Sequence, residues 1–384
     1  MLSLRVALGS RPAVLARRLL VVAAAAGTGF LLLATLGHAL THTGDTARGL
    51  IRLAWCAVPF AATVHLSVFV ARTEPSGRLH AGLSAAGLGR HGLPLLGAAS
   101  TALSTGLGVL LALLAFLHLR GDLPGSPLSG AAAGPLGADR PLPVVGALTL
   151  LALVPVVSAV ATAYCLRAAR AAATDETVVH TPPTGLPWGA ALTTIGLAIE
   201  ITAAHDARRT ATGTLFPLPG GLGGVAPAVA GGWILIAIGL VLAMPGLLHE
   251  CGRLLASCRP TALRLLAGRA LQEEAPRVGR PLGVLCAVCA AGLATTARLD
   301  AGAEPLGPLT VLGATLVAVA AAATALTATV DAKRARRPST SALTRLGAPA
   351  SLLRSAATLR TTTALVLVAP VTWLVSHLGA LPLP

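Results

Sequence analysis

Residue types that carry chemistry are sparse in this sequence, and Glu200 is the most informative of them. It lies in a long apolar stretch, Leu186–Ala204, four residues before its end. An acid in such a stretch is a functional candidate by default, because a charge in an apolar environment is costly. Together with His205 and Asp206 it would form a proton or cation site. The interpretation that we favour is snorkelling of the carboxylate toward a polar boundary about 6 Å away, which is four residues at the helical rise.

Two histidines lie within other apolar stretches, His65 and His377. Imidazole titrates near neutral pH, so either residue could relay protons. A hydrogen-bonded packing histidine is the commoner role, and we favour it for both. No run of alternating acids and histidines in the sequence resembles a proton-relay chain.

Metal, redox and peptidase chemistry have little support in the sequence. Cys286 and Cys289 form a Cys-x-x-Cys pair inside an apolar stretch, without a second pair. Packing of small buried cysteines is therefore the better interpretation. His249 and Glu250 are not followed by the second histidine of a His-Glu-x-x-His zinc motif. We expect no catalytic residue, no metal site and no cofactor in this chain.

The sequence excludes an ATP-hydrolysing site of the phosphate-loop type. That motif needs glycine directly before its lysine and Ser or Thr after it. The chain has a single lysine, Lys333, which follows an alanine and precedes Arg334. Any ATP hydrolysis linked to this chain must therefore come from a separate protein.

The elements that position these residues are apolar stretches long enough to cross a bilayer. Hydrophobic residues make up 54% of the chain and charged residues 11%, which is too little polar surface to cover a soluble core. A helix needs roughly 20 residues to cross about 30 Å of hydrocarbon. We predict an all-α fold, a polytopic transmembrane helical bundle of about nine spans. The stretches are Leu19–Leu40, Leu50–Ala71, Leu93–Leu119, Val144–Tyr164, Leu186–Ala204, Val225–Leu248, Pro281–Ala297, Pro308–Val330 and Thr361–Leu381.

The distribution of basic residues predicts the orientation of these spans. With the amino terminus in the cytoplasm, inside segments hold 22 of the 29 Lys and Arg residues, whereas the 14 acids divide evenly. This is the positive-inside pattern, and it places the carboxyl terminus outside a cell membrane. A pI of 11.4 would suggest nucleic acid as the partner of a soluble protein. Here we attribute the basic excess to anionic membrane lipids, and we expect no nucleic-acid partner.

Three inside segments combine arginine with leucine and alanine: Arg72–Gly92, Glu250–Arg280 and Asp331–Arg360. This pattern predicts amphipathic helices at the membrane surface. The outside loops are short or rich in Gly and Pro, which predicts turns without a core of their own. We therefore expect no folded domain outside the membrane.

Two landmarks suggest an internal duplication. Leu83-Ser84-Ala85-Ala86-Gly87 is echoed 260 positions later by Leu343-Thr344-Arg345-Leu346-Gly347, and the lead-ins to the first and seventh spans match at a similar offset. Both copies have the same orientation, which makes the repeat parallel; chance matching in a biased composition is the alternative. The division that follows is a first unit at 1–165, middle spans at 166–263 and a second unit at 264–384.

These features together resemble an FtsX/MacB-like ABC transporter permease of the actinobacterial type. In that family each half carries arginines, a leucine-rich stretch and a Leu-x-x-x-Gly step between its second and third spans. Arg72–Arg90 and Arg336–Pro349 are the counterparts here. The chain departs from the family in two ways, because it has no extracytoplasmic domain and has nine spans where ten are usual.

The resemblance implies a permease subunit without enzyme activity of its own. A cytoplasmic ABC ATPase subunit would dock on the short inside helices around Arg78–Arg90 and Ser341–Arg354, and its closure on ATP would be passed to the spans. Anchoring of these arginines to membrane lipids is the alternative. Pairing with a second permease, as a homodimer or heterodimer, is a further expectation. The ATPase-coupling residues would be Arg78, Leu83, Gly87, Arg90, Leu343, Arg345, Gly347 and Arg354, with Glu200 and His65 as the intramembrane polar candidates.

Three functions remain in competition at the level of sequence. The first is an export-type permease for a lipid, a peptide or a hydrophobic drug, driven by a separate ATPase. The second is a single-component transporter driven by an ion gradient, for which Glu200 is the support. The third is a membrane protein that does not transport and whose basic segments bind signalling or assembly partners. An ATPase gene beside this one would favour the first.

Overall fold

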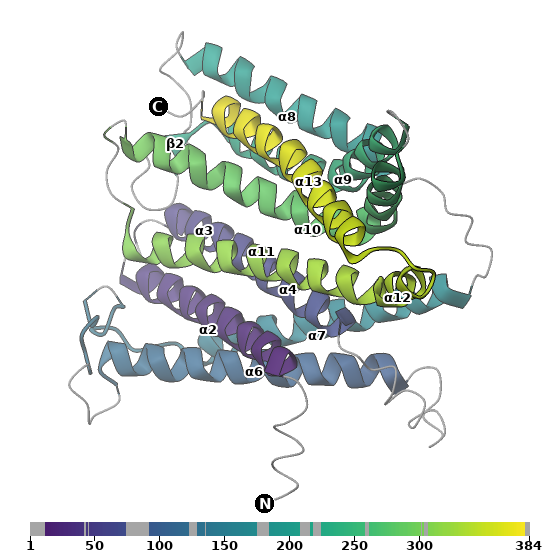
Figure 1. The fold of residues 1–384 in the computed structure, drawn as a ribbon. Coiled ribbons are helices and arrows are strands. Elements are labelled where there is room, and N and C mark those ends of the chain that lie inside the picture. Colours follow the sequence, from purple (N-terminus) through teal and green to yellow (C-terminus); the bar gives the residue numbers. More distant parts are fainter. Residues whose placement is uncertain are drawn as a thin grey trace, which may run out of the picture. The chain divides into compact units, whose positions relative to one another are not determined.

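We describe the fold from a computed structural model of the 384-residue chain (Figure 1). The predicted internal repeat stays a prediction, and so does the domain division drawn from it. The structure describes residues 12–41, 44, 46–73, 92–122, 129–134, 136–174, 184–207, 216–217, 224–257, 261–300, 302 and 306–380.

The predicted all-α membrane fold is confirmed. The described residues include nine helices that are long and apolar enough to cross a membrane. Large apolar side chains are exposed along them, such as Leu103, Val145 and Val366, which are each more than 70% accessible. Exposure of this kind is unfavourable in water and is what contact with lipid requires.

The chain divides into two compact units. Unit 1 comprises residues 1–177 and 307–323, and unit 2 comprises residues 178–306 and 324–384. The helices of unit 1 are α2 (Pro12–Thr41), α3 (Thr46–Trp55), α4 (Ala57–Thr73), α6 (Gly92–Arg120) and α7 (Val144–Thr174), with the first part of α11 (Pro308–Ala335).

Helix α2 organises unit 1, because it contacts α4, α6 and α7. Leu33 on α2 and Phe116 on α6 are both fully buried in the largest core cluster of the unit. A buried polar contact joins α2 to α4, where the hydroxyls of Thr28 and Thr63 lie 2.8 Å apart. Hydroxyl pairs of this kind are favourable between membrane helices, since lipid offers no alternative partner.

The second predicted span is broken at Cys56, where α3 ends and α4 begins. Pro59 follows in the first turn of α4 and has no N–H to donate to the carbonyl of Trp55. A proline is tolerated in a first turn, since the N–H groups there have no helical partner. The break therefore lies where the sequence cannot continue the hydrogen-bond ladder.

Unit 2 contains α8 (Gly185–Ala207), α9 (Pro227–Ser257), α10 (Ala262–Asp300), the rest of α11, α12 (Arg337–Arg345) and α13 (Ala350–Gly379). Helix α9 packs between α8 and α10, and α13 packs against α10 (Figure 1). Two short strands, β1 (Phe216–Pro217) and β2 (Gly224–Val225), pair antiparallel between α8 and α9.

The prediction of a separate surface helix in Glu250–Arg280 is wrong, because most of this segment belongs to helix α10. It runs without interruption for 39 residues, from Ala262 through Pro276 and Pro281 to Asp300. At the helical rise this is about 58 Å, well beyond the hydrocarbon thickness. The early part stays helical because it packs on α9: a Cβ atom on Gly279 would lie 2.7 Å from the nitrogen of Pro245.

Glycines seven residues apart hold α8 and α9 close together. A Cβ atom on Gly196 would lie 2.8 Å from the carbonyl oxygen of Gly232, and one on Gly239 would lie 2.7 Å from the nitrogen of Thr193. Neither position has room for a side chain. Close backbone approach at small residues is the main source of helix association in lipid, so these glycines fix the α8–α9 pair.

Candidate functional site

Helix α12 is the short inside helix that the sequence led us to expect near the end of the chain. It begins four residues before the predicted Ser341 and ends at Arg345, so Ser341–Arg354 is not one helix but the end of α12, a turn and the start of α13. The turn forms because Gly347 has a φ of +88°, which favours glycine.

The turn after α12 is fully hydrogen-bonded. The N–H of Gly347 donates to the carbonyl of Thr344 at 3.1 Å, and the N–H of Ala348 donates to the carbonyl of Leu343 at 3.0 Å. This pair of bonds defines a Schellman motif, which satisfies carbonyls that a helix end leaves free. Helix α12 is therefore joined to α13 by a defined turn.

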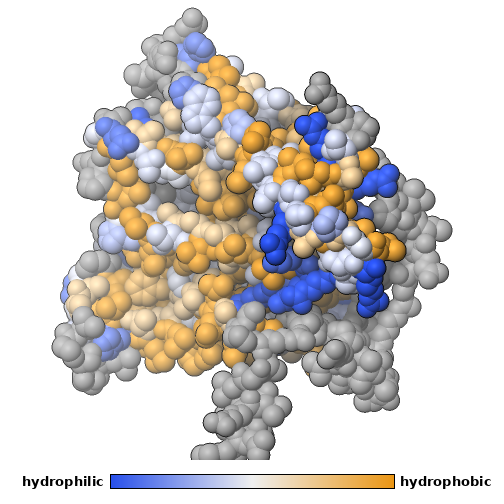
Figure 2. Space-filling model, viewed as in Figure 1, coloured by the Kyte–Doolittle hydropathy of each residue, from blue (hydrophilic) through white to orange (hydrophobic). Residues whose placement is uncertain are grey.

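None of the residues of α12 is fully buried by the part of the chain that the structure describes. Basic side chains surround it, from Lys333 and Arg334 at the end of α11 to Arg337 and Arg345 on the helix itself. Leu346, directly after the helix, is 84% exposed. Figure 2 shows hydrophilic side chains gathered over α12 and the adjoining end of α11. The result is a basic surface with an exposed leucine beside it.

An ion-pair cluster ties this surface to the bundle of unit 2. The Nε atom of Arg360, on α13, lies 3.3 Å from Oε2 of Glu274, on α10. Arg336, in the joint between α11 and α12, forms an ion pair with the other carboxylate oxygen. The side chain of Glu274 is 11% exposed and that of Arg360 13%. Three elements are thus joined at one carboxylate.

Sequence reasoning missed this cluster. Arg336 and Arg360 were expected in a basic surface segment and not as ion-pair partners, and Glu274 follows another acid, Glu273, in a segment expected to lie at the membrane surface. The three positions are 62 and 24 residues apart along the chain. No spacing rule along the sequence predicts that these three residues meet. Their contact depends on the long, continuous helix α10, which carries Glu274.

The other expected coupling residues divide into two groups. Leu343 is half-buried on α12, and Arg345, Gly347 and Arg354 are exposed, the last of them on the first turns of α13. The remaining four lie outside the described residues: Arg78, Leu83, Gly87 and Arg90.

Glu200 is enclosed within unit 2, contrary to the snorkelling that we favoured. Its side chain is fully buried. Among the described residues neither carboxylate oxygen has a hydrogen-bond partner. A Cβ atom on Gly232 of α9 would lie 3.3 Å from its Cγ, and one on Gly379 of α13 would lie 3.4 Å from its Oε2. The carboxyl group lies between helices instead of reaching along α8 toward a polar boundary.

The structure does not bring His65 and Glu200 into one unit. His65 is an exposed residue of α4 in unit 1, where its ring stacks on Phe69 with centroids 6.4 Å apart. His377 of α13 is also exposed and stacks on Trp373 at 5.4 Å. Both histidines therefore have an aromatic neighbour on their own helix.

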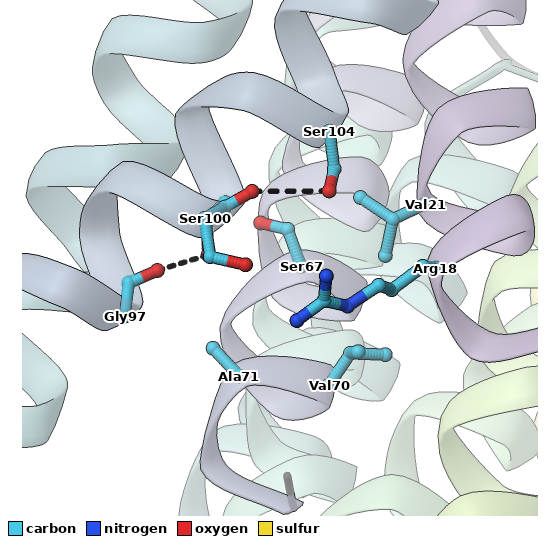
Figure 3. A pocket seen from close by; sticks show the side chains of 9 residues that line it. Arg18, Val21, Ser67, Val70, Ala71, Gly97, Ser100 and Ser104 are labelled. Atoms are coloured by element: carbon cyan, nitrogen blue, oxygen red, sulfur yellow. Dashed lines mark hydrogen bonds between the residues drawn. The ribbon is translucent and has the colours of Figure 1, made fainter. Parts of the chain in front are cut away.

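A pocket in unit 1 lies where α2 begins, α4 ends and α6 begins. In Figure 3 the guanidinium of Arg18 extends toward Ser67 and Ser100. The hydroxyls already have partners in the chain: Ser67 donates to the carbonyl of Val64 at 2.8 Å, and Ser104 donates to that of Ser100 at 3.0 Å. This pocket offers one cation and few free hydrogen-bonding groups, so we assign it no role.

Comparison of the chain with family models, curated proteins and solved structures gives no match. The geometry of α12, of the cluster at Glu274 and of Glu200 therefore carries the functional argument.

Proposed function

We propose that this chain is the permease subunit of an export-type ABC transporter. It would couple ATP hydrolysis by a separate cytoplasmic ATPase to movement of a lipid, a peptide or a hydrophobic drug across the cell membrane. In this proposal the amino terminus lies in the cytoplasm and the carboxyl terminus outside. The observation that carries the proposal is α12, a short basic helix between two spans, with none of its residues buried by a described part of the chain.

A helix that receives force from a partner must be exposed to the partner and firmly joined to the spans. Helix α12 meets the first requirement through its exposed arginines, Arg337 and Arg345. It meets the second at both ends. Arg336 pairs with Glu274 of α10 before it, and the Schellman turn at Gly347 leads directly into α13 after it. Movement of α12 would therefore be transmitted to α10 and α13 together.

The occupant that fits this surface is an acidic groove on an ATPase subunit. The segment from Lys333 to Arg354 carries six basic side chains and no acid. Opposite charges at a docking surface increase the rate and specificity of association. Membrane lipid headgroups are the competing occupant, and the experiment below separates the two.

The experiment is copurification of the chain with cytoplasmic ABC ATPase subunits expressed in the same cells. The variant R337E/R345E reverses two exposed charges of α12, and R269E, which reverses an exposed charge on α10, is the control. We expect loss of ATPase from the purified complex in the first variant alone. The difference between this variant and wild type should narrow as salt rises, because exposed charges are screened within about 8 Å at physiological ionic strength. Equal recovery of ATPase with both variants would leave lipid anchoring as the role of α12.

A single-component transporter driven by an ion gradient is the second candidate, and the buried Glu200 is the observation that favours it. Transport in vesicles that contain the purified chain and no ATPase would favour this candidate over the ABC permease.

A further inference from the structure

Glu200 is a fully buried carboxyl group in a helix that is apolar enough to span a membrane. Three helices of unit 2 enclose it: its own helix α8, then α9 at Gly232 and α13 at Gly379. Gly379 is the last residue of α13. The final turn of α13 is thus one of the elements that cover the carboxyl group.

An ionised carboxylate in this position is strongly disfavoured. Burial of an isolated charge costs far more than burial of a neutral polar group, so such groups bind a proton instead. Among the described residues no arginine or lysine pairs with Glu200, and neither oxygen accepts a hydrogen bond. The packed arrangement is therefore compatible with the neutral acid and not with the anion.

The surroundings favour a proton over a metal cation. Sodium and similar ions need several oxygen ligands around them, and the part of the chain that the structure describes holds no group of three acidic, histidine or cysteine side chains that could bind a metal ion.

Titratable groups on the enclosing helices are few. On α8 the exposed His205 lies five residues after Glu200, and the side chain of Asp206 lies outside the described residues. On α13 the exposed His377 lies two residues before Gly379. On α9 the first titratable residue is His249, 17 positions beyond Gly232. Both histidines near Glu200 are exposed on the surface of unit 2.

We propose that Glu200 is a reversible proton-binding site of unit 2, neutral while α9 and the last turn of α13 cover it and ionised when that turn moves away. The site binds one proton for each cycle of opening and closing. It stands apart from the proposed ATPase coupling, because α12 contributes nothing to it. Proton binding would then accompany transport whatever drives the conformational change.

Infrared spectroscopy of the full-length chain in lipid vesicles tests this proposal without ATP or an ATPase. The difference between wild type and E200Q isolates the carbonyl stretch of a protonated Glu200 carboxyl. We expect this band at neutral pH, a shift of the band in heavy water, and its reversible loss at alkaline pH. The matched control is E250Q, because Glu250 is one-third exposed and pairs with Arg253 at 2.9 Å. E250Q should leave the Glu200 band unchanged.

Three results would overturn the proposal. They are absence of the Glu200 band at neutral pH, its persistence at every pH, and its loss on addition of sodium or potassium at constant pH, which would identify a cation site. If E200Q does not fold, the variant E200D retains the carboxyl group in a shorter side chain. The band should then change frequency, and an unchanged band would belong to another residue.

Discussion

Glu274 of α10 binds Arg360 of α13, with 3.3 Å between Oε2 and Nε, and it also binds Arg336 at the joint before α12. One buried carboxylate therefore holds two arginines that belong to different elements. Removal of one partner from a buried ion pair is costly, because it leaves the other charge without compensation. This cluster is the structural link between the exposed α12 and the spans, and it is the first place to test.

The variant E274Q should destabilise the chain by about 3 kcal/mol, since two arginines lose their common partner. Thermal unfolding in detergent measures the loss. The matched control is E250Q, which removes an exposed pair with Arg253 that is worth at most about 1 kcal/mol. Equal stability of E274Q and E250Q would show that the cluster contributes no more than a surface pair.

The turn between α12 and α13 should depend on glycine at position 347. The variant G347A puts a side chain at a φ of +88°, which costs about 1–2 kcal/mol and weakens the defined connection between the helices. We expect reduced coupling of ATP hydrolysis to transport, with membrane insertion unchanged. The control is G292A in the helical part of α10, where no atom lies within 4 Å of an added Cβ and alanine should stabilise. A fully coupled G347A transporter would remove the turn from the mechanism.

The α8–α9 pair should not tolerate a side chain at Gly239. The variant G239V drives atoms into the backbone at Thr193 and should cost about 3 kcal/mol or prevent the two helices from packing. Yield of monodisperse protein and unfolding temperature measure the effect. G231A, on the same helix and with open space around an added Cβ, should behave as wild type. Similar losses in both variants would show that close packing at Gly239 is not the cause.

Composition and stretch length were sufficient to predict the membrane fold, because the bilayer sets the length of every span. They could not predict where helices break or continue. Cys56 interrupts a stretch that is mostly apolar, since Pro59 removes one N–H, whereas α10 continues through two prolines because α9 supports it. The outcome in each case depends on packing against a neighbour, which a single stretch does not encode.

The candidate site was predictable only in part. Charge and glycine position indicated a short helix near Gly347, and an acid in an apolar stretch indicated Glu200. The partners of each were not predictable. Whether Glu200 extends to a polar boundary or is enclosed depends on Gly232 and Gly379, which lie 32 and 179 positions later in the chain. Such contacts follow from helix pairing, which the sequence pattern alone leaves open.

The most direct test of the proposed function is transport by the purified chain in vesicles, with and without the ATPase subunit that copurifies with it. We expect export of a lipid, peptide or drug probe only when the ATPase and ATP are both present, and loss of that transport in R337E/R345E. Transport at an unchanged rate without the ATPase, driven by an imposed ion gradient, would contradict it.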